Sequence, residues 1–255
     1  MKRLFATLLL ALCWSLQPLS SSAATWVHLY DIGYEGSVSL DADSFSYDHE
    51  KDTVHLWQKI VSEGDNSVLE LEYSYNLGEQ TVALLGEGFY QPGEAPSYQR
   101  YTQISYQPIS QGSYAENTFY FLQLVDFLEK NNINWEFNRT TIPKHSSLDS
   151  SDWEMGAPNF VYDTGTAYSD KDKESYWTYG EDRLDYIELN KADESFAVLA
   201  QRFMQNGDIV LGFNYPLAIW SNPQGQMTEA HQQAMQAQAV ILNGIFESYV
   251  SLNAE

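Results

Sequence analysis

The sequence predicts an α+β fold of two tandem units, each an antiparallel β-meander packed by a C-terminal helix. Runs of β-branched and aromatic residues that alternate with polar residues predict the strands. Each half of the chain closes in a run with helical spacing. A segment also recurs, since NLGEQTVALLGEGFYQPGE at 76–94 aligns without a gap on NKADESFAVLAQRFMQNGD at 190–208, an offset of 114. Such a repeat predicts two small cores in place of one large core.

The segments that flank this match keep their order in both halves. Corresponding landmarks are Trp26 with Trp153, Asp41 with Asp163, Asp48 with Asp170, Gly112 with Gly225, and Glu116 with Glu229. The offset is 127 for the two tryptophans, 122 for the two aspartate pairs and 113 after the match. Colinear order argues against a chance similarity between two strand-rich stretches.

Residues 1–24 have the pattern of a signal peptide. Lys2 and Arg3 precede an apolar run at 4–14, and small residues at 22–24 precede the expected cut. The run is shorter than the roughly 20 residues of a membrane span. We therefore expect an exported chain that begins near Thr25 and resides in the periplasm, at the cell surface or in the medium. A lipoprotein is the weaker reading, because Leu12 stands where a small residue would precede a lipidated Cys13.

Cleavage would leave a strongly acidic chain without cysteine. It would remove the single cysteine and two of the 13 basic residues but none of the 35 acidic ones, which leaves a net charge of −24. Disulfides then cannot contribute to stability, so packing must. Because this charge repels phosphate backbones, nucleic acid is not expected as a partner.

The first unit is predicted over 25–132. Its expected strands are 38–40, 53–61, 68–76 and 81–90, and its expected helix is 114–130. In 69–76, apolar Leu and Tyr alternate with Glu, Ser and Asn, which gives the meander one buried and one wet face. The helix is expected to cover the buried face, with Leu122, Val125 and Leu128 on one side.

Residues 133–151 have the composition of a connector, and the second unit is predicted over 152–255. Its expected strands are 159–162, 175–179, 184–189, 196–204 and 208–219, followed by a closing helix at 228–249. Met235, Leu242, Ile245 and Tyr249 are expected to form the buried stripe of that helix.

One segment gives two conflicting signals. Lys191 to Asn206 reads as a helix, with Asn190 as a cap and Gly207 as a stop. Its counterpart at 81–90 reads as a strand. If the repeat is real, tertiary context should make 195–204 a strand against its local propensity.

Three acidic or histidine patterns could suggest chemistry, and each has a simpler reading. Asp163-Thr164-Gly165-Thr166 matches the motif around the catalytic aspartate of aspartic proteases, which need two such aspartates. The counterpart at 41–44 lacks the glycine, so it does not supply the second one. The end of a strand followed by a turn explains the same residues. The acids Asp41, Asp43, Asp48, Glu50, Asp52, Asp170, Asp172 and Glu174 could hold calcium, but lysines interleave with them, which favours solvated hairpin tips. The five histidines have no metal spacing, and no serine lies in GxSxG.

The order of landmarks resembles the surface-adhesin protein E-like family of exported bacterial proteins. The landmarks are Trp-Val at 26–27, Leu-Asp-x-x-Ser at 40–44, Val-x-x-Trp-x-Lys at 54–59 and Gly-Ser-x-x-Glu at 112–116, with more worn counterparts in the second half. The resemblance implies a small antiparallel sheet backed by a helix and, for some members, binding to host or matrix proteins. Members often carry a cysteine pair that this mature chain lacks, so no binding residue is carried over.

We therefore expect an exported, non-enzymatic, adhesin-like binding protein that acts through protein or glycan contacts, without a catalytic residue, cofactor or metal. The alternative is an exported hydrolase whose acidic residues meet only in three dimensions. Two close, buried carboxylates in a cleft would favour the hydrolase, whereas shallow sheet faces with exposed aromatic residues would favour binding.

Overall fold

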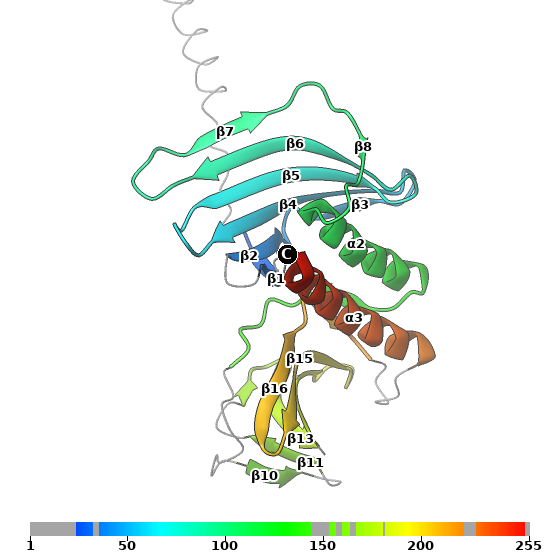
Figure 1. Ribbon diagram of the computed structural model, residues 1–255. Coiled ribbons are helices and arrows are strands. Elements are labelled where there is room, and N and C mark those ends of the chain that lie inside the picture. Colours follow the sequence, from blue (N-terminus) through cyan, green and yellow to red (C-terminus); the bar gives the residue numbers. More distant parts are fainter. Residues whose placement is uncertain are drawn as a thin grey trace, which may run out of the picture.

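The computed structural model describes residues 24–32, 36–143, 153–156, 160–163, 167–180, 182–221 and 228–252. In this part of the chain, antiparallel strands predominate and two helices pack beside them, which is a mainly β form of the expected α+β class (Figure 1). Two large sheets follow one another along the sequence. A third sheet of two strands pairs one strand that follows the first large sheet with one strand that follows the second.

The first sheet has eight strands in the order β1-β2-β4-β5-β6-β7, with β3 paired to β4 and β8 to β6. The strands are β1 (Trp26–Ile32), β2 (Gly36–Asp41), β3 (Ser46–Asp48), β4 (Thr53–Ser62), β5 (Val68–Asn76), β6 (Thr81–Tyr90), β7 (Ser97–Arg100) and β8 (Gln107–Pro108). The predicted strands 68–76 and 81–90 are confirmed at both ends.

The second sheet has seven strands in the order β10-β11-β13-β14-β15-β16, with β12 paired to β13. The strands are β10 (Trp153–Gly156), β11 (Phe160–Asp163), β12 (Tyr168–Ser169), β13 (Lys173–Gly180), β14 (Arg183–Asn190), β15 (Phe196–Gln205) and β16 (Asp208–Asn214). The conflict at 191–206 is thus resolved, because Phe196–Gln205 is a strand. Pairing with β14 and β16 overrides the local helical propensity.

Corresponding strands of the two sheets share their register. Trp26 pairs with Asp41 where β1 meets β2, and Trp153 pairs with Asp163 where β10 meets β11. Each of β6 and β15 has one β-bulge, at Leu85 and at Leu199, which are 114 residues apart. The offset of 114 therefore also aligns the ladders of β5, β6 and β7 with those of β14, β15 and β16.

The turns correspond as well. Gln80 and Glu194 both adopt the left-handed conformation, with φ of 54° and 59°. Gly93 and Gly207, again 114 residues apart, have φ of 87° and 88°, a region that favours glycine.

The helix α2 (Tyr114–Lys130) covers one face of the first sheet, as predicted. Ser113 caps it, since its Oγ accepts a hydrogen bond from the Glu116 backbone N at 3.1 Å. The apolar side of α2 packs on the alternate residues of β1, β2, β4 and β5 that point toward it. The fully buried members of this core include Leu29, Val38, Val54, Leu56, Tyr75, Phe121, Leu122, Val125 and Leu128.

The closing helix corrects one prediction. We expected it to pack on the second meander, but α3 (Glu229–Leu252) packs mainly against α2 and β1 of the first half (Figure 1). Ala234 is fully buried in the first core, and Met235 packs against that core. The side chains of the predicted stripe residues Ile245 and Tyr249 lie outside the described part.

The expected strand 208–219 is broken, and this break explains where α3 goes. β16 ends at Asn214, and Pro216, which has no N–H to donate to a ladder, precedes β17 (Leu217–Ile219). β17 pairs with β9 (Trp135–Phe137), a strand within the predicted connector. The chain thereby leaves the second sheet, and Leu217 and Ile219 are buried in the first core.

Candidate binding face on the first sheet

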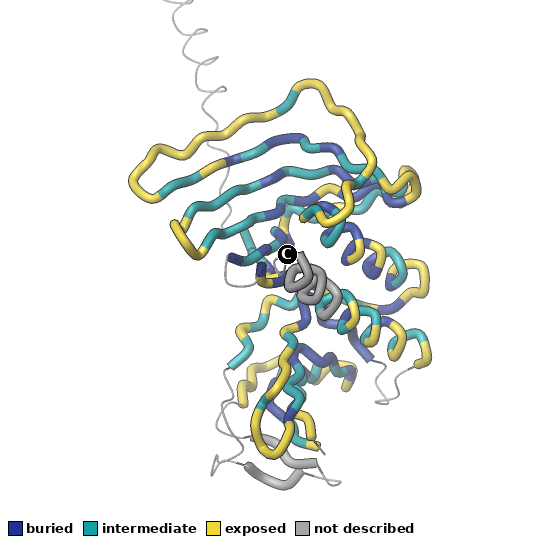
Figure 2. The backbone as a smooth tube through the Cα atoms, viewed as in Figure 1, coloured by how far each residue is buried: buried dark blue, intermediate teal, exposed yellow. Residues whose placement is uncertain are grey.

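The first sheet presents a face opposite α2, which we call the outer face. Its side chains alternate along the strands with the core residues Leu56, Leu71 and Leu40, so they point away from the helix. The outer face comprises Trp26, His55, Trp57, Lys59, Glu70, Glu72, Ser74, Gly86, Gly88, Tyr90, Tyr98, Arg100 and Tyr106. In Figure 2 the strands of this sheet grade from buried to exposed toward β7 at the edge.

Aromatic rings lie across a floor of two glycines. Tyr98 is 41% exposed, and its ring lies 6.0 Å from that of Trp57, centroid to centroid. A Cβ atom on Gly86 would lie 2.9 Å from the Tyr98 hydroxyl, and one on Gly88 would lie 3.4 Å from the Tyr90 ring. Gly86 therefore leaves room for Tyr98 to lie along the sheet, whereas a Cβ atom on Gly88 would only touch the Tyr90 ring.

Charged groups stand between the rings. Arg100 donates a hydrogen bond from its guanidinium to Glu72 Oε1 at 3.2 Å, and the other oxygen, Oε2, is buried without a hydrogen-bond partner. Tyr90 donates to Glu70 at 3.1 Å. Lys59 places its ammonium 4.2 Å from the centroid of the Trp26 ring, a cation–π distance.

Burial and neighbouring charges shift the pKa values of three side chains on the outer face. Burial, helped by the charge of Glu70, raises the pKa of Tyr90. Burial and the charge of Glu72 raise the pKa of Tyr98, although Arg100 opposes the effect. Burial lowers the pKa of Lys59, and Glu70 opposes it. Near neutral pH the tyrosine hydroxyls therefore stay protonated and available as donors.

A short hydrogen-bond chain ends the face toward β8. The hydroxyls of Tyr106 and Ser74 lie 2.6 Å apart, and Ser74 Oγ lies 3.3 Å from His55 Nε2. Tyr106 is 42% exposed. The face thus offers rings, hydroxyls, carboxylates and cations together.

The second sheet closes the corresponding face. Trp177, which matches Trp57 in the ladder, is fully buried, and the guanidinium of Arg202 lies 5.3 Å from its ring centroid. Arg202 stands at the position of Gly88, and Gly212 stands at that of Tyr98. The large and small residues are thus exchanged between the two strands. Tyr98 lies beside Trp57 and leaves it partly exposed, whereas Arg202 lies over Trp177, which is fully buried.

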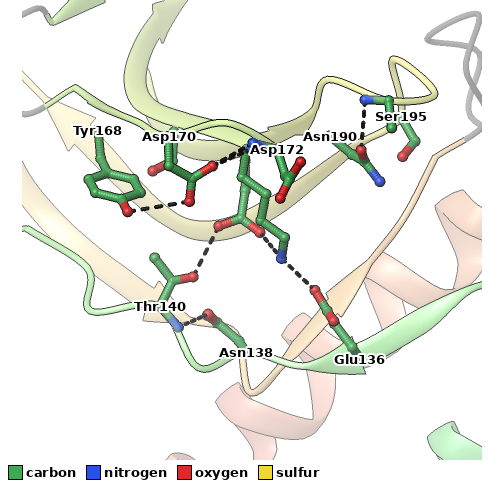
Figure 3. A network of polar contacts seen from close by, with 12 residues as sticks. Glu136, Asn138, Thr140, Tyr168, Asp170, Asp172, Asn190 and Ser195 are labelled. Atoms are coloured by element: carbon green, nitrogen blue, oxygen red, sulfur yellow. Dashed lines mark hydrogen bonds and ion pairs between the residues drawn. The ribbon is translucent and has the colours of Figure 1, made fainter.

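A second polar cluster lies near β9, between β13 and β14 (Figure 3). The Lys173 ammonium binds Glu188 at 2.8 Å and Glu136 at 2.9 Å, and Thr140 donates to Glu188 at 3.1 Å. Burial lowers the pKa of Lys173, but the two glutamates outweigh it and raise the pKa above its usual value. These residues line a cavity of about 80 Å³. The ammonium thus bridges the two carboxylates.

The acids that could have held calcium lie in turns, or in strands next to turns, of two separate sheets. Asp48 accepts hydrogen bonds from the backbone N of Glu50 and from the Lys51 ammonium, and Asp170 accepts from the backbone N of Asp172 and Lys173. Within the residues that the structure covers, no three His, Cys, Asp or Glu side chains gather as a metal site would require. Asp163 ends β11, and 164–166 lie outside the described residues.

Sequence reasoning did not assign the outer-face residues. The alternation of Leu and Tyr with Glu, Ser and Asn at 69–76 predicted a wet face, but aromatic residues on both faces concealed which of them are exposed. The sequence feature that could have identified this face is the pair of glycines in β6, because a strand residue without a side chain leaves space for large neighbouring side chains.

No family model matches this chain, and no curated protein is significantly similar to it. The described helices include none that is long and apolar enough to cross a membrane.

Proposed function

We propose that this chain is an exported bacterial binding protein, without catalytic activity, that acts through protein or glycan contacts on the outer face of the first sheet. The observation that carries the proposal is the open face itself, where Trp57, Tyr98 and Tyr106 lie beside Glu72 and Arg100. Binding sites combine aromatic area with a few placed polar groups. Export rests on the signal-peptide pattern at 1–24, and adhesin-like surface binding on the family resemblance.

We further propose that the two halves, 25–132 and 152–255, are duplicated units that have diverged. Shared strand order, shared register and the matched bulges at Leu85 and Leu199 support this origin. In the first sheet Gly88 faces Tyr98, and at the same positions of the second sheet Arg202 faces Gly212. Each pair thus combines one large and one small residue, a match that would not be expected of two unrelated sheets. The first unit keeps the binding face, whereas the second fills it.

Affinity capture by the mature chain tests the binding function. Chain 25–255 is immobilised and exposed to native envelope material and host matrix extracts, beside a Tyr98→Ala variant and a Tyr168→Ala control. Tyr168 is 57% exposed on the second sheet. We expect a ligand that wild type and control retain and that Tyr98→Ala loses. Capture of nothing, with activity in a broad hydrolase screen, would favour the alternative of an exported hydrolase.

A further inference from the structure

We propose that the ligand of the outer face is an uncharged oligosaccharide. This inference rests on the proposed binding function and narrows it to one chemical class. It is carried by the combination of neighbouring aromatic rings, an unpartnered carboxylate oxygen and a nearly balanced local charge on a strongly acidic chain.

The rings supply the apolar part of such a site. The C–H faces of a sugar ring pack on the flat faces of Trp and Tyr, which combine large area with few rotatable bonds. Tyr98 and Tyr106 are 41% and 42% exposed, and Trp57 lies beside Tyr98. Because Gly86 and Gly88 carry no side chain, the Tyr98 hydroxyl and the Tyr90 ring lie close over β6, and these rings form the surface on which a sugar ring can pack.

The polar groups match hydroxyls, which both donate and accept hydrogen bonds. Glu72 Oε2 is buried and has no hydrogen-bond partner, which is unfavourable for a carboxylate oxygen. A sugar hydroxyl that reaches this oxygen as Tyr98 turns aside would supply that partner. Arg100 and Lys59 can donate to sugar oxygens, and Glu70 can accept.

Charge separates this ligand from two competitors. The charges of Glu70, Glu72, Lys59 and Arg100 sum to zero. Asp41, which pairs with Trp26 and acts on Lys59, brings the sum to −1, whereas the whole chain has a net charge of −22. The field of an acidic chain repels an anionic glycan. A protein partner is disfavoured because the centre of a protein interface is depleted of charged residues, and here four of them occupy the centre.

The face is wide enough for several sugar units. Trp26 on β1 and Tyr98 on β7 are separated by five strand spacings, about 24 Å at about 4.8 Å each. A chain of sugars, and not a single one, would be needed to contact both ends.

The test uses the mature chain 25–255 with cellohexaose, maltohexaose and chitohexaose, three uncharged hexasaccharides. Binding is followed by titration calorimetry and by tryptophan fluorescence. We expect at least one hexasaccharide to bind, with about tenfold weaker binding by Tyr98→Ala and by Glu72→Gln. The control Tyr168→Ala, which removes an exposed tyrosine of the second sheet, should bind as wild type does. Unchanged melting temperatures would show that both variants fold.

The outcomes separate this inference from the proposed function. If no hexasaccharide binds but a protein from the capture experiment binds and is lost by Tyr98→Ala, the oligosaccharide inference is wrong and the binding function stands. If a hexasaccharide binds equally to wild type, Tyr98→Ala and Glu72→Gln, the assignment to the outer face is wrong. If neither a sugar nor a protein binds, both proposals fail.

Discussion

Replacing Leu217 should destabilise the first half of the molecule, although this residue lies in the second half of the sequence. Leu217 is fully buried, and it belongs to the core formed by α2 and the first sheet. The change Leu217→Ala removes three carbon atoms, which at about 0.8 kcal/mol each amount to about 2.4 kcal/mol. The cavity that remains adds to this loss, so we expect the free energy of unfolding to fall by about 3–4 kcal/mol.

Urea unfolding of the mature chain measures this loss, and hydrogen exchange locates it. Val240→Ala is the matched control, because Val240 is 69% exposed on α3 and its removal should cost less than about 0.5 kcal/mol. In Leu217→Ala, amides of β4 and β5 should exchange faster. A loss below about 0.5 kcal/mol, or faster exchange confined to β13–β15, would refute the docking of β17 and α3 on the first core.

Two further predictions concern single residues of the second half. Lys173→Ala leaves the carboxylate of Glu188 buried without its cation, and we expect a loss of roughly 2–3 kcal/mol, less than for a fully buried pair. By contrast, Lys51→Ala, which breaks an exposed pair, should leave the urea unfolding curve nearly unchanged. The pKa of Lys173 is higher in the folded than in the unfolded chain. The stability that this pair contributes should therefore be fully present below pH 10.5 and disappear as the pH rises past the folded pKa. A stability–pH profile that is the same with and without Lys173 would contradict this. Gly207→Ala should cost about 1–2 kcal/mol because φ is 88°, whereas Gly180→Ala, which meets no atom within 4 Å and has no positive φ, should be close to neutral in thermal unfolding.

Local patterns predicted most elements of the fold. The period of two at 68–76 and the capped apolar run at 114–130 predicted β5 and α2 with their bounds. For 196–205 local propensity indicated a helix, and only the comparison with 81–90 indicated the strand that forms. This segment is a strand because β14 and β16 flank it, and such neighbours are set by tertiary structure.

The partner of the closing helix could not be read from periodicity. A buried stripe shows that a helix packs, but not against which surface. Pro216 marks a break in the expected strand 208–219, and the pairing of β17 with β9 then decides where α3 lies. The outer face was hidden for a related reason, since Trp57 and Trp177 occupy equivalent positions and only their neighbours make one partly exposed and the other buried.

Hydrogen exchange with bound hexasaccharide tests most directly whether the first sheet binds ligand on its outer face. The mature chain is saturated with the hexasaccharide that binds best, and amide protection is compared with that of the free chain. We expect the amides of β5, β6 and β7 to exchange more slowly when the sugar is bound, and those of β13–β15 to be unchanged. Protection confined to the second sheet or to the cavity beside Lys173, or no protection anywhere, would contradict it.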